Sequence, residues 1–379
     1  MRVIDADAHV IETAETFADP YWDPALAERR PRVVDLGQRL AWLIDDVLYP
    51  RTRGRGASRV GGPAAHEGRP SPFEARKRDS LESITLSDVD ARCRQMDEEE
   101  IGFQVVFPSM FLRGQLSEDP ALETALARSY NGWIADRCAR RPERLGWVAV
   151  VNLRDVPGAI AELRRCAEEG EALGVMILGA AGDRHLNHPE VLPFFAAAEQ
   201  LDLAVAVHAG RPRPELGNLF ETPYEQFVLP FVTSLFMGFV DIVAGGVLDR
   251  CPALRVAFLE AGCQWIPFLV DRADHYAELA LERRFTDYGA KEVPGAYLRR
   301  GNLFASTEVD DRMLPYVVER FGTELLFFAS DIPHGDRDYH GARELGERSD
   351  LSEEAKSRIL AQNALRFYGA RLEARLRGR

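Results

Sequence analysis

Short apolar runs rich in β-branched and aromatic residues recur along the chain, and most are separated by segments with helical periodicity. The eight runs are Val3–Ala6, Phe103–Phe107, Leu145–Val151, Gly174–Leu178, Leu203–Val207, Arg255–Leu259, Asn302–Ala305 and Leu325–Ala329. The helical segments are Asp88–Glu100 with Ser87 as N-cap, Ala121–Arg140, Val156–Glu169, Pro189–Gln200, Tyr224–Leu248 and Arg312–Phe321. This alternation predicts an α/β fold, a (β/α)8 TIM barrel of parallel strands covered outside by helices.

One connection departs from this alternation and predicts a long insertion after strand 1, at about residues 13–85 of a single barrel domain spanning 1–379. Arg32–Asp35 and Leu40–Ile44 are expected to pair as a hairpin within it. The stretch from Arg51 to Pro72 is rich in Arg and Gly, which indicates a mobile segment or one ordered by a partner subunit. Because the insertion leaves from the C-terminal end of a strand, we expect a lid over the barrel mouth; a structural flap on the rim is the alternative.

The most apolar stretch, Phe227 to Leu248, is interrupted by Pro230, Asp241 and the Gly245-Gly246 pair. These interruptions favour a core helix over a membrane span.

Net charge excludes some partners. The chain of 379 residues carries a formal charge of −13, which argues against binding to nucleic acid or to an anionic membrane surface. The 5 cysteines have no CxxC spacing and are typical of reduced thiols, so we expect a cytoplasmic protein.

Four residues follow or end predicted strands and point to metal chemistry: Asp7, His9, His208 and Asp331. Residues at the C-terminal ends of parallel barrel strands converge on one mouth. Taken singly, such a histidine has a structural alternative and such an aspartate a capping one. Together, two imidazoles and two carboxylates predict one divalent metal ion, with Zn²⁺ favoured and Mn²⁺ or Fe²⁺ as alternatives.

Several motifs together resemble the amidohydrolase-related family, the branch of metal-dependent TIM-barrel hydrolases that includes the 2-amino-3-carboxymuconate-6-semialdehyde and γ-resorcylate decarboxylases. They are Ile4–Val10, His208–Gly210, Phe258–Gly262 and Ser330–His334, supported by Met96-Asp97, Tyr130-Asn131 and Asn363–Gly369. The resemblance covers nearly the whole chain and implies a mononuclear site held by the same four residues. Two-metal barrels of this superfamily usually use a carboxylated lysine at the end of the fourth strand, where this chain has Leu178-Gly179.

Glu260 ends the sixth strand, where the decarboxylases of the family usually carry a histidine. A carboxylate there is a candidate general base, proton shuttle or additional ligand. A structural glutamate is the alternative.

Weaker candidates for substrate binding lie in the loops that follow the strands: Arg113, Arg211, Glu308, His334 and Asp336. An arginine in such a position can clamp a carboxylate.

The leading functional hypothesis is metal-dependent hydrolysis of a small amide, lactone or related acyl compound. In it Asp331 takes a proton from metal-activated water and Glu260 delivers one to the leaving group. The alternative is non-oxidative decarboxylation of an aromatic or unsaturated carboxylic acid. A barrel kept as a non-catalytic scaffold is a third hypothesis. Analogy with the family leads us to expect a homo-oligomer, a dimer, that acts on a small molecule.

Overall fold

The computed structural model describes residues 2–58, 60–71, 78–283, 287–335, 337 and 339–378. Its centre is an 8-stranded sheet in the order β1-β7-β8-β9-β10-β11-β12-β13. The strands are β1 (Val3–Val10), β7 (Ile101–Pro108), β8 (Leu145–Val150), β9 (Gly174–Leu178), β10 (Ala204–His208), β11 (Val256–Leu259), β12 (Leu303–Thr307) and β13 (Leu326–Phe328). Every pair is parallel, and the predicted (β/α)8 barrel with an insertion after its first strand is confirmed.

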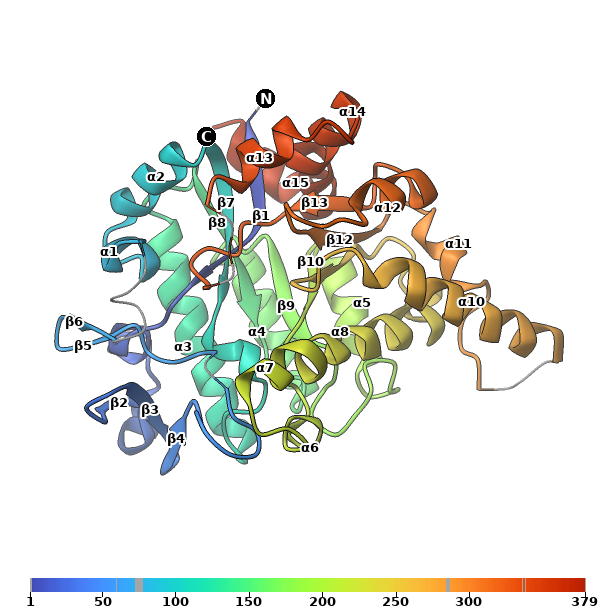
Figure 1. Cartoon of the computed structure of the whole chain (residues 1–379). Coiled ribbons are helices and arrows are strands. Elements are labelled where there is room, and N and C mark those ends of the chain that lie inside the picture. Colours follow the sequence, from blue (N-terminus) through green and yellow to red (C-terminus); the bar gives the residue numbers. More distant parts are fainter. Residues whose placement is uncertain are drawn as a thin grey trace.

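Helices surround the strands in Figure 1, so residues on both faces of the strands are buried. The longer helices are α2 (Val89–Glu98), α3 (Pro120–Cys138), α4 (Val156–Glu168), α5 (Leu192–Gln200), α8 (Val232–Phe239), α10 (Trp265–Arg283), α12 (Leu314–Phe321) and α15 (Asn363–Leu376). Shorter ones are α1 (Leu81–Ile84), α6 (Pro214–Gly217), α7 (Pro223–Gln226), α9 (Val247–Arg250), α11 (Pro294–Leu298), α13 (Gly341–Glu347) and α14 (Glu353–Ser357). Single turns and π segments are η1 (Ala14–Phe17), η2 (Pro24–Arg29), η4 (Met110–Arg113), η5 (Phe227–Phe231), η6 (Val240–Ala244) and η7 (Arg358–Gln362).

Two predicted helices differ from the observed ones. The N-cap of α2 is Asp88 rather than Ser87, because the Asp88 carboxylate accepts a hydrogen bond from the Asp90 N–H at 2.9 Å. The single helix predicted over Tyr224–Leu248 is a chain of α and π segments from α7 to α9, with Gly246 in the left-handed region at φ 76°. Pro223–Arg250 is the one described helix long and apolar enough to cross a membrane, and 50% of its apolar window is buried inside the structure.

The first and last strands meet through hydrogen bonds that bring β13 to β1. The Ser330 N–H donates to Asp5 Oδ1 at 2.9 Å, and the Asp331 N–H donates to the Asp7 carbonyl at 3.2 Å. From α15, Tyr368 Oη donates to the Ala6 carbonyl at 2.7 Å. These contacts hold the end of the chain against its beginning at the level of the predicted metal donors.

The insertion forms small antiparallel sheets of its own. The predicted hairpin is confirmed as β2 (Arg32–Asp35) and β3 (Leu40–Ile44), extended by β4 (Val47–Tyr49); β5 (Ala65–His66) pairs with β6 (Arg69–Pro70). Contacts within the chain hold the described part of the stretch predicted to be mobile or partner-ordered: the Ala64 N–H donates to the Glu12 carbonyl at 3.3 Å, and the Gly56 N–H to the Phe220 carbonyl at 2.9 Å. Arg59 and Pro72 of that stretch lie outside the described residues.

Candidate metal centre

The donors predicted from β1 and β10 lie together at the C-terminal end of the barrel. Asp7 Oδ1 is 3.4 Å from His9 Nε2, and Asp7 Oδ2 is 3.4 Å from His208 Nε2. All three side chains are buried. Asp7 and His9 are two residues apart on one strand, so they face the same side, while His208 is the last residue of β10.

Asp331 completes the predicted set from the segment after β13. Its Oδ1 atom lies 3.5 Å from His9 Nε2. The backbone of Asp331 has φ 52°, in the left-handed region that residues other than glycine seldom adopt. The hydrogen bond from its N–H to the Asp7 carbonyl holds this turn.

Backbone carbonyls orient both imidazoles. His9 Nδ1 is 3.0 Å from the Pro108 carbonyl and His208 Nδ1 is 2.8 Å from the Ala209 carbonyl, so each Nδ1 carries the donated proton and each Nε2 keeps its lone pair. These Nε2 atoms and Asp7 Oδ1 have no hydrogen-bond partner in the described part of the chain. Four ligands at about 2.1 Å around one tetrahedral ion lie about 3.4 Å apart. The buried orphan atoms and their spacing therefore fit a single divalent metal ion.

Charge in the centre also favours a bound cation. Burial would raise the pKa of Asp7, yet the neighbouring His208 and His9 lower it below the usual range. Burial would lower the pKa of His208, yet Asp7 and then Glu260 raise it to about 9. The carboxylates thus draw positive charge toward His208 Nε2, the position a metal ion would take.

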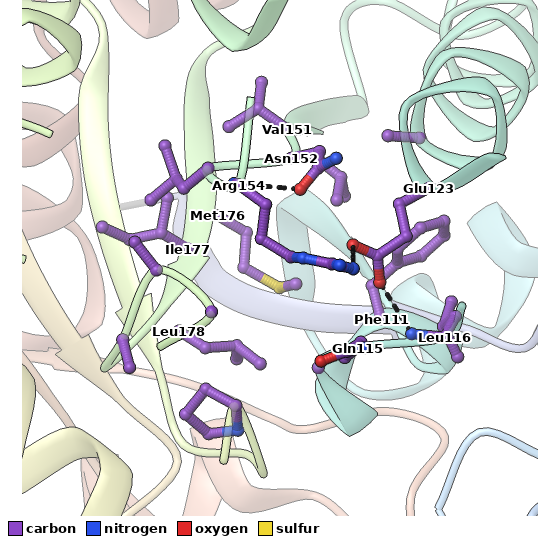
Figure 2. A pocket seen from close by; sticks show the side chains of 18 of the residues that line it. Phe111, Gln115, Leu116, Glu123, Val151, Asn152, Arg154, Met176, Ile177 and Leu178 are labelled. Carbon is purple, nitrogen blue, oxygen red and sulfur yellow. Dashed lines mark hydrogen bonds and ion pairs between the residues drawn. The ribbon is translucent and has the colours of Figure 1, made fainter. Parts of the chain in front are cut away.

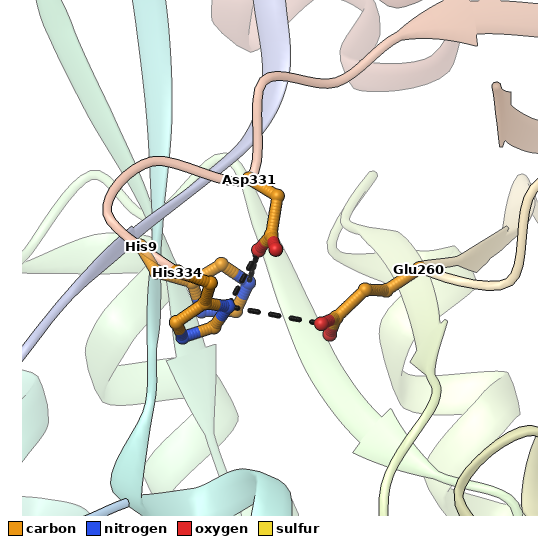
Figure 3. Close-up of side chains that lie close together, drawn as sticks. All are labelled: His9, Glu260, Asp331 and His334. Carbon is orange, nitrogen blue, oxygen red and sulfur yellow. Dashed lines mark hydrogen bonds and ion pairs between the residues drawn. The ribbon is translucent and has the colours of Figure 1, made fainter. Parts of the chain in front are cut away.

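Glu260 and His334 lie together with His9 and Asp331 in Figure 3 and form one wall of the centre. His334 Nδ1 lies 2.6 Å from Asp331 Oδ1 and 3.7 Å from Glu260 Oε1, and its ring centroid lies 4.3 Å from that of His9, with the rings tilted by 34°. Glu260 Oε2 is 3.4 Å from His208 Nδ1. Like Asp331, Glu260 has a left-handed backbone at φ 59°, which the hydrogen bond from its N–H to Ser306 Oγ at 2.9 Å supports.

Both members of this wall have shifted pKa values. Burial, followed by the charge of Asp331, raises the pKa of Glu260 to about 8. Burial would lower the pKa of His334, but Asp331 and then Glu260 raise it well above its usual value. Each group therefore holds a proton near neutral pH, beside the candidate metal centre.

A buried network behind the centre includes Glu12 and Arg92, which the sequence did not single out, and Ser109, which follows the second barrel strand as a candidate residue of the mouth. Ser109 Oγ lies 2.9 Å from His334 Nε2, and the Ser109 N–H donates to the buried Glu12 carboxylate at 3.1 Å. The fully buried Arg92 of α2 donates to the His9 carbonyl at 2.8 Å. One signal was available: Arg92 falls on the buried stripe of its helix, with Val89, Cys93 and Met96.

The residues predicted to bind substrate do not lie together in one site. His334 is at the centre. Arg113 and Arg211 are largely buried below the insertion, and Glu308 is exposed and belongs to neither cluster of possible metal ligands among the described residues. Asp336 lies outside the described residues.

A pocket lies between η4, α3 and the ends of β8 and β9 (Figure 2). Phe111, Met176 and Leu178 give it apolar walls, and the ion pair of Arg154 with Glu123 at 2.8 Å is part of its lining. Leu178 pairs with His208 across adjacent parallel strands, so the two side chains face the same way. The four candidate donors are not among its lining residues, and Leu178 is the strand neighbour that relates the pocket to the metal centre.

Known proteins resemble this chain over most of its length. It is 26% identical over 290 residues to the 2-amino-3-carboxymuconate-6-semialdehyde decarboxylase of Dictyostelium discoideum, covering 74% of this chain and 77% of that protein. It is 25% identical over 311 residues to the γ-resorcylate decarboxylase of Rhodococcus jostii, covering 76% of this chain and 90% of that protein.

Solved structures share the fold. An amidohydrolase from Mycobacterium avium subsp. paratuberculosis matches with a TM-score of 0.77 and 22% identity, over 97% of this chain and 98% of that one. The 5-carboxyvanillate decarboxylase of Novosphingobium aromaticivorans, solved with manganese and a nitrobenzoic acid, matches with a TM-score of 0.73 and 17% identity, over 97% of each chain.

These relatives overturn the leading hypothesis from the sequence. Hydrolysis of an amide, lactone or acyl compound is wrong as the main reading, because the similar proteins of named activity are decarboxylases. The membership of an amidohydrolase family had suggested water as the nucleophile. The residue at position 260 had also weighed against decarboxylation, because it is a glutamate where a histidine was expected.

The family itself is clear from the whole chain. The profile described as "Amidohydrolase" matches residues 4–370, which include all four candidate donors and the barrel from its first strand into its last helix. With the fold and the donor set in agreement, the chain belongs to the amidohydrolase family and is an enzyme of that superfamily.

Proposed function

We propose that this enzyme is a metal-dependent decarboxylase, a carboxy-lyase that removes CO₂ from an aromatic or unsaturated carboxylic acid. The decarboxylases among its relatives support this reaction class. The observation that carries the proposal within this chain is the pairing of Glu260 with His334 beside the metal donors, 3.7 Å apart. Decarboxylation needs a protein acid at that place, and both groups favour the protonated form.

Asp7, His9, His208 and Asp331 are the residues that would hold the metal ion. When bound, a divalent ion supplies Lewis-acid chemistry toward the substrate carboxylate and an adjacent oxygen. Asp331 has a second task in this arrangement, because its Oδ1 atom at 2.6 Å fixes the ring of His334.

The protein residues supply and replace one proton. The bond between the substrate carbon and its carboxyl group breaks, CO₂ leaves, and the electron pair stays on the carbon. Glu260 delivers its proton to that carbon and becomes a carboxylate. His334 then returns a proton to Glu260, and Ser109, 2.9 Å from His334 Nε2, holds the far side of the imidazole ring. Glu260 thus replaces the histidine usual at this strand end.

The pocket beside His208 supports an aromatic or extended unsaturated substrate. Its walls from Phe111, Met176 and Leu178 match the apolar faces of a ring, and Leu178 is the strand neighbour of the metal donor His208.

We also propose which metal ion this enzyme binds, in which compartment it works and how its subunits assemble. The mixed nitrogen and oxygen donors suit Zn²⁺ or Mn²⁺, and a related structure was solved with manganese. The 5 cysteines are buried and unpaired, as in a reducing compartment, which supports a soluble cytoplasmic enzyme. We propose a homodimer by analogy with the family.

The test is CO₂ release from hydroxylated benzoic acids by protein loaded with Mn²⁺ or Zn²⁺. In D₂O, the vacated ring carbon should gain deuterium, because the protein acid exchanges with solvent. Glu260→Gln is expected to reduce turnover by roughly 10²- to 10⁴-fold while metal content is unchanged, since the amide has no proton to give at neutral pH.

Glu319→Gln, on the exposed surface of α12, is the matched control and should behave as wild type. Undiminished CO₂ release by the Glu260→Gln variant would show that Glu260 is not the acid that protonates the substrate carbon. Failure of the loaded wild-type enzyme to release CO₂ from any aromatic or unsaturated acid in a broad panel would overturn the reaction class.

A further inference from the structure

Two arginines near the barrel mouth have no anionic partner among the residues that the structure describes. Neither Arg113 nor Arg211 forms an ion pair within the described residues, whereas many arginines of this chain do, Arg29 and Arg165 among them. Arg113 Nε and Nη1 are buried without any hydrogen-bond acceptor in that part of the chain. Arg211 Nη1 meets only neutral oxygens, the Gly56 carbonyl at 3.1 Å and Gln226 Oε1 at 3.4 Å.

The loops that carry these arginines are joined at the mouth. Arg113 ends η4, which follows β7, and Arg211 lies three residues after His208. The Arg211 N–H donates to the Leu112 carbonyl at 2.9 Å. Gly114, at φ 84°, permits this approach, because a Cβ atom there would lie 2.4 Å from the Arg211 carbonyl.

The insertion covers both arginines from above. The guanidinium of Arg113 lies 4.0 Å from the ring centroid of Tyr49, the last residue of β4, and Gly56 of the insertion accepts from Arg211. Gly114 and Pro212, the residues that follow the two arginines, line the pocket at the ends of β8 and β9. The two guanidinium groups are therefore held between the insertion and the loops that border this pocket.

The burial of both guanidinium groups carries an electrostatic cost to the stability of the protein. Burial lowers the pKa of Arg113 to about 10, and the charge of Arg51 contributes to this shift. Burial, followed by the charge of Arg113, lowers the pKa of Arg211 to about 10. Two neighbouring cations taken out of water without an anion destabilise the protein, and an anionic ligand removes that penalty.

We propose that Arg113 and Arg211 form a second anion-binding subsite, which takes a carboxylate of the substrate other than the one lost as CO₂. The substrate is then an aromatic or unsaturated dicarboxylic acid, one carboxylate at the metal centre and the other at the rim. This inference rests on the proposed decarboxylase function. A guanidinium offers a planar fork of donors that matches a carboxylate, and the Tyr49 ring packs against the fork of Arg113.

Calorimetric titration of the Mn²⁺-loaded protein with benzoate and with the three benzenedicarboxylates tests the subsite. At least one dicarboxylate should bind about tenfold or more tightly than benzoate, since a new charge-assisted pair is formed. Arg113→Met and Arg211→Met should each abolish most of this preference and leave the affinity for benzoate unchanged. Arg113→Lys, which keeps the charge without the fork, should retain part of it.

Arg213→Met is the matched control, because Arg213 lies two residues from Arg211 and has its own partner in Glu215 at 3.5 Å. It should keep the full preference. Equal affinity of the wild-type protein for benzoate and all dicarboxylates, or a preference that survives both Met substitutions, would overturn the subsite. Circular dichroism confirms that each variant is folded.

The two proposals fail separately. If the arginine-dependent preference is found but no dicarboxylate loses CO₂, the subsite stands and the decarboxylase function falls. If monocarboxylic acids lose CO₂ at rates that neither arginine affects, and no preference for dicarboxylates is seen, the function stands and the subsite falls.

Discussion

Glu260 and Asp331 share a backbone conformation that side chains seldom adopt, with φ values of 59° and 52°. Glu260 directly follows β11, and Asp331 lies in the segment just after β13. Each residue is held by a hydrogen bond that its own N–H donates. Such strain is retained where the fold enforces it, and it is common at functional sites. The turn it produces brings both carboxylates toward His334.

Asp331→Asn tests this residue directly. Asparagine tolerates the left-handed region and keeps the side-chain volume, so the variant should fold as wild type. It loses a charged metal donor and the anchor of His334, so turnover should fall by roughly 10²- to 10⁴-fold. Steady-state CO₂ release and metal content measured on one sample check this result; wild-type turnover would contradict both assigned roles.

The raised pKa of Glu12 predicts how the stability of the folded protein changes with pH. Burial raises its pKa from 4.5 to about 8, although the Met110 and Ser109 amides donate to it. Between those two pH values the folded state keeps a proton that the unfolded chain has lost, so the contribution of Glu12 to stability decreases as pH rises.

Glu12→Gln removes this titration. The unfolding free energy of wild type minus that of the variant should therefore decrease from pH 5 to pH 8 in chelator-treated protein, measured by urea denaturation. An increase in this quantity over the same range would mean that the amide donors dominate and keep Glu12 ionised.

Single residues differ in how far the sequence could place them. Asp7, His9 and His208 were predictable as neighbours because each belongs to a strand, and strand ends of a parallel barrel share one mouth. His334 was only a weak candidate, since its 2.6 Å contact with Asp331 depends on a loop turn that no periodicity encodes. Glu308 was an equally weak candidate for substrate binding in the sequence, yet its side chain is exposed.

At the scale of elements, Arg92 connects a helix to the strand that carries the metal donors. Its guanidinium donates to the Ser83 carbonyl at 3.0 Å, to Gln104 Oε1 at 3.2 Å and to the His9 carbonyl at 2.8 Å. All these contacts are buried, so α2 and β1 are fixed relative to each other through one side chain.

Arg92→Met should destabilise the protein by roughly 3 kcal/mol or more, because several buried acceptors lose their donor at once. Arg94→Met is the control: Arg94 is 66% exposed, and its one ion pair within the described residues is with Asp88 at 3.2 Å. An exposed pair of this kind contributes about 0–1 kcal/mol. Urea unfolding of both variants decides the matter; equal midpoints would show that α2 is held by its apolar face alone.

The strands were more predictable than the segments between them. Each barrel strand contains a buried apolar run, and its ends agree with the predicted ones within a few residues. The helix after β10 was not predictable as a chain of α and π segments, because Pro230 and Gly246 reveal an interruption but not its geometry. Within the insertion, only the β2–β3 hairpin could be predicted from the sequence, because other parts of the insertion contact distant loops such as that of Phe220.

For the whole molecule, a bound metal ion should contribute to stability as well as to catalysis. Ligand present at about 1,000 times its Kd adds about 4 kcal/mol to the unfolding free energy. For a chain of this size that corresponds to roughly 5–10 °C in Tm. Chelation should therefore lower Tm by this amount, and added Mn²⁺ or Zn²⁺ should restore it.

His208→Asn should remove the response of Tm to metal, because it deletes a buried Nε2 donor. His275→Asn, on the exposed surface of α10, should keep the full response. A metal-dependent Tm in the His208→Asn protein equal to that of wild type would place the ion elsewhere.

The contact between β13 and β1 has a consequence for synthesis in the cell. Asp7 and His9 belong to β1, whereas Asp331 and the Ser330 that binds Asp5 follow β13, the last strand of the barrel. A nascent polypeptide thus has no complete set of donors until all eight barrel strands have been made. Metal loading then follows synthesis of the whole barrel, and any truncated product that stops before Asp331 would lack the carboxylate that completes the donor set.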